Sequence, residues 1–268
     1  MKLVVGEHLA YAYTGGKGFD ASAPCVVFVH GALHDHSVWT LLARWYANHG
    51  WAVLAPDLPA HGRSKGPPLD SVEALADWLL ALLDAANVQQ AALAGHSLGS
   101  LIALQTAGQA PERVSHLVMA GTGYPMAVSA ALLESARATP LAAIDAVNVF
   151  SHSTFAAKPS YPGPGSSLHG GNRALMRRVQ AGCGEANLFL VDFQVCDRYR
   201  GGLEAAARVR CPVTIAVGEQ DQMTRPGQAV ELAAALKSTP VRLPAGHAMM
   251  AEAPELLLAV LKKALPPR

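Results

Sequence analysis

Short apolar runs of strand length alternate along this chain with longer runs whose apolar residues recur at helical spacing. The run CVVFVHG at 25–31 is almost continuously apolar, as a strand covered on both faces should be. The segment at 37–50 that follows it places its apolar residues on one helical face. Because parallel strands need a crossover helix between them, this alternation predicts an α/β fold with a mostly parallel central sheet and helices on both faces.

The cycle repeats along most of the sequence, but it lapses between about 123 and 208. There, helical stretches and a Pro/Gly/Ser-rich loop at 158–171 replace the strands. We therefore expect a core domain made of 1–122 and 209–268, with 123–208 as a helical insertion over one end of the sheet. The further expected strands are 51–58, 91–97, 114–122, 211–221 and 241–247, and the further expected helices in the core are 71–88, 98–110, 226–238 and 254–265.

Composition excludes several classes of protein. Hydrophobic residues make up 51% of the chain and charged residues 15%, which is typical of a globular protein. The 21 basic and 20 acidic residues form no long run of either sign, so we expect neither nucleic acid nor a membrane as a partner. The start of the chain lacks the apolar core of a signal peptide, and the four cysteines show no CxxC spacing. We expect free thiols and a cytoplasmic protein.

Functional groups of parallel sheets collect at the carboxyl ends of the strands. In this chain those ends supply a hydroxyl, imidazoles and carboxylates; they are His30-Gly31, Asp57, Ser97, Asp221 and His247. A serine hydroxyl becomes a nucleophile when a base takes its proton, and that base needs an acid to orient it. The strand ends therefore contain all three groups.

Ser97 stands in LAGHSLGS, between Gly95 and Gly99, where an expected strand passes into an expected helix. A sharp elbow there would expose the hydroxyl above the sheet and leave no room for larger side chains at the two flanking positions. The structural alternative is a helix-capping serine, but a cap does not need glycine on both sides. We predict that Ser97 is the nucleophile.

The predicted base is His247, just after the last expected strand, and Asp221 is predicted to orient it. The resulting order of Ser, Asp and His along the chain is characteristic of one hydrolase architecture. Glu219 is the nearest rival acid, because strand alternation would aim positions 219 and 221 the same way. For the oxyanion we expect the backbone amides of Leu98 and Ala32, with Leu33 as a less favoured alternative to Ala32.

Several stretches together resemble the successive signatures of the α/β-hydrolase superfamily; they are His30-Gly31, DLPAHGRS at 57–64, GHSLG at 95–99, GEQD at 218–221 and GH at 246–247. The resemblance implies the α/β-hydrolase fold and its Ser-Asp-His triad, and 123–208 is similar to the helical cap of lidded members. Relatives acting on haloalkanes or epoxides carry an aspartate where this chain has Ser97, which argues against both reactions. The chain also lacks the HGGG oxyanion loop of one esterase branch.

These residues predict a serine hydrolase that cleaves a small, mostly apolar ester through an acyl-enzyme, with a small molecule as its partner and no cofactor. The same triad can act on thioesters, lactones or carbon–carbon bonds of diketone-like substrates, or carry out perhydrolysis. A ligand receptor on a hydrolase scaffold is the alternative from another class.

Other residues have structural interpretations. The HDH triplet at 34–36 lacks the wider ligand spacing of hydrolytic zinc sites, so we expect no metal there. His61 is expected to be a structural loop residue, and His96 is expected to pack or bond locally and not to act as a second base. A set of apolar side chains could line an acyl pocket or fill the core of the insertion; they are Met126, Phe150, Phe155, Phe189 and Phe193.

Overall fold

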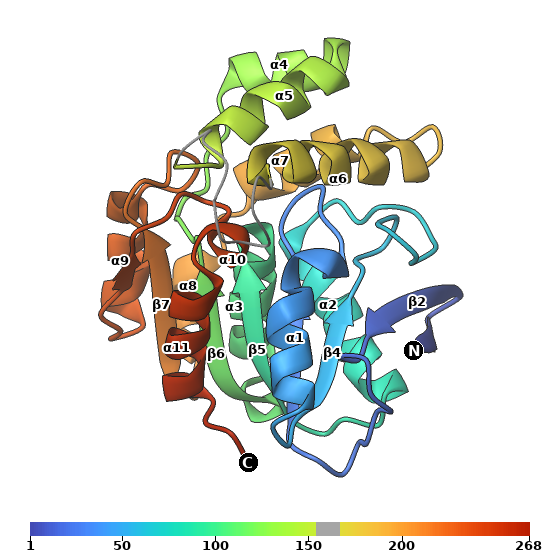
Figure 1. Ribbon diagram of the computed structural model, residues 1–268, viewed down its shortest axis with the longest axis vertical. Coiled ribbons are helices and arrows are strands. Elements are labelled where there is room, and N and C mark those ends of the chain that lie inside the picture. The colour runs from blue at the N-terminus through green and yellow to red at the C-terminus, as the bar shows by residue number, and fades with distance from the viewer. Residues whose placement is uncertain (154–166) are drawn as a thin grey trace.

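Eight strands form one sheet in the order β1-β2-β4-β3-β5-β6-β7-β8, and the computed structural model describes residues 1–153 and 167–268 (Figure 1). From β4 to β8 along that order, all neighbouring strands are parallel, which confirms the predicted sheet. These strands are β3 (Cys25–Val29), β4 (Ala52–Pro56), β5 (Ala91–His96), β6 (Val114–Ala120), β7 (Val213–Gly218) and β8 (Val241–Leu243).

An antiparallel hairpin of β1 (Lys2–Val5) and β2 (His8–Tyr13) extends the sheet beside β4. These two strands lack the pattern that predicts the central ones. Each is only partly buried, so neither carries the continuous apolar run that marks the central strands.

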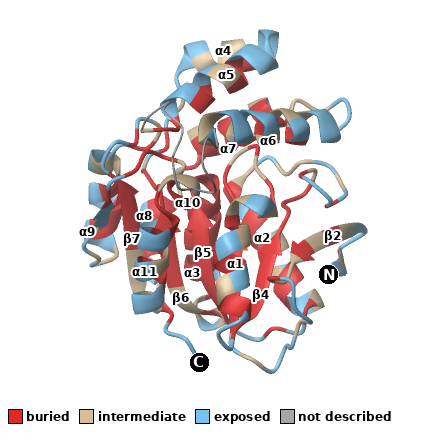
Figure 2. Cartoon of the chain, viewed as in Figure 1, coloured by how far each residue is buried: buried red, intermediate tan, exposed pale blue. Residues whose placement is uncertain are grey.

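Helices cover both faces of the sheet, as the alternation predicts, and alternate residues of the central strands enter two separate cores. Within β3, Val27 and Val29 face the helices α2, α3, α8 and α9, whereas Val26 and Phe28 face α1 and α11. Figure 2 shows the buried residues running along the strands between these layers. The helices on these faces are α1 (Thr40–Ala47), α2 (Val72–Ala85), α3 (Leu98–Gln109), α8 (Gly202–Arg208), α9 (Val230–Ala235) and α11 (Pro254–Ala264).

Local sequence signals set several helix starts. The Ser71 hydroxyl accepts the amide of Ala74 at the start of α2, and proline opens both η3 and α11. The helix expected at 37–50 consists of a 3₁₀ turn followed by α1, and the one expected at 226–238 likewise begins with a 3₁₀ turn. The remaining short elements are η1 (His36–Trp39), η2 (Pro111–Arg113), η3 (Pro226–Ala229) and α10 (Met249–Glu252).

Four helices lie above the carboxyl ends of the strands (Figure 1). We call them the upper layer; they are α4 (Ala130–Ala138), α5 (Pro140–Phe150), α6 (Leu168–Gly182) and α7 (Leu188–Arg198). They share a small apolar core of their own around Ile144 and Phe189. The described part of 123–208 is thus helical, although its last helix, α8, packs against α3, where Gly108 meets the backbone of Ala205.

Most of the predicted Pro/Gly/Ser-rich loop at 158–171 lies outside the described residues, and so does Phe155. All four cysteines are free thiols, as predicted. In the two described ranges, no helix has the length and apolar character needed to cross a membrane.

Candidate active site

Ser97 occupies a strained elbow between β5 and α3, with φ 53° and ψ −120°. The close packing of the two flanking glycines explains the motif. A Cβ on Gly95 would lie 2.1 Å from the carbonyl oxygen of Gly99, and a Cβ on Gly99 would lie 2.3 Å from that of Val29. Such distances are far below van der Waals contact, so both positions require glycine. The elbow that the sequence predicts is confirmed.

Asp221 and His247 meet above the ends of β7 and β8. The Nδ1 atom of His247 lies 2.8 Å from Oδ2 of Asp221, which is 1% exposed. The other carboxylate oxygen accepts the amides of Met223 and Thr224, each at 2.8 Å. Burial alone would raise the pKa of Asp221, but His247 and the bonds from Thr224 lower it below its ordinary value. Asp221 is therefore a fixed carboxylate, and Nδ1 of His247 carries the hydrogen that faces it.

The rival acid, Glu219, is exposed and does not contact His247 in the described structure. The expectation that positions 219 and 221 point the same way is wrong. Strand β7 ends at Gly218, and the amide of Asp221 donates to the carbonyl of Gly218, so a turn replaces the alternation.

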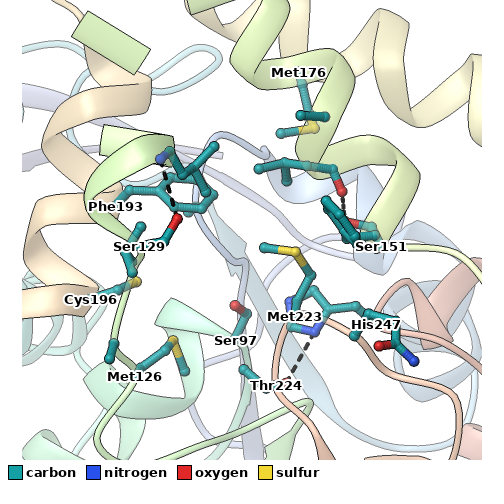
Figure 3. A pocket seen from close by; sticks show the side chains of 18 of the residues that line it. Ser97, Met126, Ser129, Ser151, Met176, Phe193, Cys196, Met223, Thr224 and His247 are labelled. Atoms are coloured by element: carbon teal, nitrogen blue, oxygen red, sulfur yellow. Dashed lines mark hydrogen bonds between the residues drawn. The ribbon is translucent and has the colours of Figure 1, made fainter. Parts of the chain in front are cut away.

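Ser97 and His247 line one cavity of about 450 Å³ beneath the upper layer. In Figure 3, Ser97 lies between Met126 and Cys196 on one side and Met223 and His247 on the other. A hydrogen bond joins the elbow at Ser97 to the loop that carries His247. In it, Nε2 of His96 donates to the carbonyl of His247 at 2.9 Å. The structure thus brings together the three side chains that the sequence analysis selected.

His96 lies beside Ser97 and bonds a distant part of the chain, because its Nε2 faces the carbonyl of His247, 151 residues further on. Its burial, followed by the neighbouring His247 and His34, holds its pKa well below the ordinary value. The ring is therefore neutral, with its one hydrogen on the nitrogen that faces the carbonyl of His247.

The loop after β3 is held by the ring of His30. Nδ1 of His30 donates to the carbonyl of Gly31 at 2.8 Å, and Nε2 accepts the amide of Leu58 at 3.0 Å. Burial lowers the pKa of His30 to about 4, consistent with a neutral ring. In this loop, the amide of Leu33 donates to Asp192 at 2.7 Å, whereas the amide of Ala32 has no hydrogen-bond partner among the described residues. The amide of Leu98, at the start of α3, also has none among them.

The HDH triplet diverges in the structure. His34 lines the cavity and contacts Asn172, whereas Asp35 and His36 turn toward Asp57. The ligand atoms of Asp35, His36 and Asp57 lie within 4.8 Å of one another, as a metal site would need. Both carboxylates, however, already accept protein hydrogen bonds on each of their oxygens, so hydrogen bonding accounts for the cluster.

The cavity wall is rich in sulfur and aromatic carbon. Its lining includes Met126, Met176, Met223 and Cys196, together with Phe150 and Phe193. Phe189 does not reach the cavity but stacks on Phe193 within the upper layer, with ring centroids 4.4 Å apart. In the described part of the chain, the wall has no Lys, Arg, Asp or Glu. The described wall of this cavity is mostly apolar.

A second cavity of about 290 Å³ adjoins the first. The two share His34, His96, Ser151 and His247, but the second does not include Ser97. Its described wall is also free of Lys, Arg, Asp and Glu and includes the polar side chains of Ser37 and Asn172.

Two residues that contact this site were not predicted from the sequence. Thr224 lies three residues after Asp221, and its hydroxyl is 2.8 Å from Oδ2 of Asp221. Asp192 reaches the loop after β3 from α7. The available signal for Asp192 was a single acidic residue within the apolar stretch LFLVDFQVC.

The sequence pattern that defines the alpha/beta hydrolase family matches residues 26–260, most of the chain. The chain belongs to the α/β-hydrolase family. Over 138 residues, this α/β hydrolase is 36% identical to a dihydrolipoyllysine-residue acetyltransferase component of the acetoin cleaving system of Pseudomonas putida. That match covers 49% of this chain and 35% of the relative, so the chain spans about a third of the relative's length.

Solved structures resemble the α/β hydrolase over nearly its whole length. The enol-lactonase from Burkholderia xenovorans LB400 superposes with a TM-score of 0.83 at 20% identity, covering 99% of both chains. An esterase from Exiguobacterium antarcticum gives a TM-score of 0.82 at 15% identity, covering 98% of this chain and 97% of the esterase. At such identities the likeness establishes the fold, and the substrate must be argued from the site.

Proposed function

We propose that this α/β hydrolase is a serine hydrolase that cleaves neutral, mostly apolar carboxylic esters through an acyl-enzyme. One observation carries the proposal: the buried Asp221–His247 pair opens onto the same cavity as Ser97 on its strained elbow. A nucleophile, a base and an orienting acid are the three parts that such a reaction needs.

In the proposed reaction, Oγ of Ser97 attacks the ester carbonyl carbon while Nε2 of His247 takes the hydroxyl proton. Asp221 stabilises the resulting imidazolium through Nδ1. Collapse of the tetrahedral intermediate breaks the bond to the alcohol, which leaves with the proton from His247. Water then attacks the acyl-enzyme in the same manner and releases the acid and Ser97, so the reaction needs no cofactor or metal.

The amides of Ala32 and Leu98 are proposed to stabilise the oxyanion. Both lack a partner among the described residues, and Leu98 is the first residue of α3, where the helix dipole favours negative charge. The amide of Leu33 is already occupied by Asp192, which favours Ala32 over the alternative.

The two cavities support the substrate class. The described walls lack Lys, Arg, Asp and Glu, which suits a neutral substrate, and unbranched methionine side chains adapt to acyl groups of different shapes. We assign the larger cavity to the acyl group. The smaller one is assigned to the alcohol, because His247 lines it without Ser97 and must return the proton to that group. Perhydrolysis is disfavoured, since a peracid would oxidise the methionines that line the larger cavity.

We also propose that 123–208 acts as a cap over the core formed by 1–122 and 209–268. The upper layer supplies one side of the larger cavity, through residues such as Leu132, Val147 and Met176. The four free thiols suit a reducing compartment such as the cytoplasm.

The test uses p-nitrophenyl esters of increasing acyl length together with a fluorophosphonate probe. The wild type should hydrolyse the esters with an initial burst and take up one equivalent of probe, and Ser97→Ala should lose both while remaining folded. Ser115→Ala, at the opposite end of the sheet, is the matched control and should retain both. Labelling that survives Ser97→Ala would place the nucleophile elsewhere. Tight ester binding by the wild type, without any burst, would favour the receptor alternative.

A further inference from the structure

Asp192 joins the upper layer to the loop that follows β3. It lies on α7 with its carboxylate buried, and its Oδ2 accepts two hydrogen bonds. One comes from the amide of Leu33 at 2.7 Å and the other from Nε2 of His61 at 2.9 Å. Its partners precede it by 159 and 131 residues, so these bonds depend on how α7 docks on the core.

The amide that Asp192 holds belongs to a strained residue. Leu33 has φ 54°, a left-handed conformation that is unfavourable for a residue with a side chain, and it is completely buried. Such a conformation persists only where its surroundings fix it. The hydrogen bond from Leu33 to Asp192 is one such constraint, and it acts on the residue directly after Ala32.

Both peptide planes that flank Ala32 are fixed. The carbonyl of Gly31 accepts Nδ1 of His30 at 2.8 Å and the amide of His34 at 3.3 Å. In a trans peptide the N–H points opposite to the C=O, so these two bonds also aim the amide of Ala32. The next plane, between Ala32 and Leu33, is held by Asp192. The amide of Ala32 is therefore aimed from the core side by His30 and from the upper layer by Asp192.

The charge of Asp192 is balanced by His61. Nδ1 of His61 faces the carbonyl of Pro59 at 2.9 Å while Nε2 faces Asp192, so both ring nitrogens must carry hydrogens. Both side chains of this imidazolium–carboxylate pair are almost completely buried. An unbalanced carboxylate beside the oxyanion loop would oppose the negative charge that develops there. The pairing removes that conflict and leaves Asp192 free to act as a hydrogen-bond acceptor.

We propose that Asp192 is a positioning residue for the oxyanion hole, holding the amide of Ala32 in its working orientation through Leu33. The inference rests on the proposed function, since it takes Ala32 as an oxyanion donor. It makes turnover depend on the docking of α7, and this dependence should act on the transition state more than on substrate binding.

The experiment compares two Asp192 variants with a matched control. Asp192→Asn keeps one acceptor oxygen but loses the charge, and Asp192→Leu removes both. Arg178→Gln breaks a different ion pair between the upper layer and the same loop, from Arg178 on α6 to Asp35 at 2.8 Å, without touching residues 31–33. Loss of a whole oxyanion donor lowers kcat by about 10²–10³-fold. A donor that is present but wrongly oriented should therefore lower kcat by about 10–100-fold.

We expect kcat to fall about 10–100-fold in Asp192→Leu and less in Asp192→Asn, with KM changed less than about threefold in either. Arg178→Gln should change kcat less than about twofold. Affinity for an alkylboronic acid, whose adduct with Ser97 places an anionic oxygen in the hole, should fall by the same factor as kcat. Binding of uncleaved ester to Ser97→Ala and to the double variant Ser97→Ala/Asp192→Leu should be equal.

Three results would overturn the inference. They are a normal kcat in Asp192→Leu, a loss shared equally by Arg178→Gln, and a loss seen only in KM. If Asp192→Leu does not fold, Asp192→Asn still tests the proposal. Hydrogen exchange at the Leu33 amide should be faster in Asp192→Asn than in the wild type. An unchanged exchange rate would also count against the proposal. Failure of the proposed function looks different, since the wild type itself would then show no ester turnover or Ser97 labelling.

Discussion

Nδ1 of His247 lies 2.8 Å from Oδ2 of Asp221, and that oxygen receives a second contact, from the hydroxyl of Thr224, at 2.8 Å. The partner carboxylate oxygen is held by two backbone amides of the same turn. Asp221 therefore cannot rotate without breaking several bonds. This fixed carboxylate leaves His247 with one tautomer and one ring orientation, with Nε2 available to act as a base.

Replacing Asp221 by Asn should reduce kcat by about 10⁴-fold with little change in KM. Asparagine keeps the shape but turns an N–H or a neutral carbonyl toward His247, so the ring loses its imposed tautomer and its stabilised charge. Steady-state kinetics on a chromogenic ester measure the effect. Glu219→Gln is the matched control, because Glu219 is the exposed acid two residues away and should leave kcat unchanged. Comparable losses in the two variants would show that Asp221 is not the orienting acid.

Replacing Gly99 by Ala should prevent the elbow from forming. The added Cβ would lie 2.3 Å from the carbonyl oxygen of Val29 and 2.5 Å from that of His30, which are backbone atoms of the strand end and cannot rotate away. We expect a lower Tm and a loss of Ser97 labelling. Gly182→Ala is the control: this exposed glycine ends α6, a Cβ added to it would meet nothing within 4 Å beyond its own helix, and alanine there should be neutral or stabilise by up to about 1 kcal/mol. A Gly99→Ala protein with wild-type Tm and labelling would contradict the steric argument.

Local sequence patterns predicted the central strands and the residues at their carboxyl ends. β3 and β5 are buried on both faces and so are apolar throughout, and the topology of a parallel sheet places their carboxyl ends at one edge. Ser97, Asp221 and His247 could be selected on that basis. Asp192 could not, because its partner Leu33 lies 159 residues away and only the docking of α7 joins them.

The missed strands and the wrong expectation for Glu219 also have physical causes. The strands β1 and β2 pair at the sheet edge with one face exposed, which weakens their apolar pattern. The expectation for Glu219 extended strand alternation past the residue where β7 ends.

Truncating Met176 should lengthen the acyl cavity. Met176 is buried in the upper layer and lines the larger cavity on the side away from Ser97 (Figure 3). Methionine to alanine removes three heavy atoms, so the preferred acyl chain should grow by about two or three carbons, each extra buried methylene contributing about 0.8 kcal/mol. A series of p-nitrophenyl esters gives kcat/KM against chain length. Leu133→Ala, which removes apolar volume from the same layer outside both cavities, should leave the profile unshifted. An unshifted profile in Met176→Ala would place the acyl group elsewhere.

The His61–Asp192 pair predicts how stability depends on pH. Burial by itself lowers the pKa of His61, but Asp192, the carbonyl of Pro59 and the nearby Asp57 together raise it above the ordinary value. The ring of His30 lies 5.0 Å from that of His61. It adds no positive charge between about pH 5.5 and 9, because its own pKa is lowered to about 4.

Since the folded-state pKa of His61 is the higher one, the contribution of the pair to stability is complete below about pH 6.5. It is lost as pH rises through the raised value, when the imidazolium gives up its proton. Denaturant unfolding of the wild type and Asp192→Asn from about pH 5.5 to 9 measures this. The difference in unfolding free energy should be largest at the acidic end and narrow as pH rises. For Arg178→Gln the difference should stay constant, because arginine does not titrate in this range. A pH-independent difference for Asp192→Asn would mean that His61 is not charged in the folded protein.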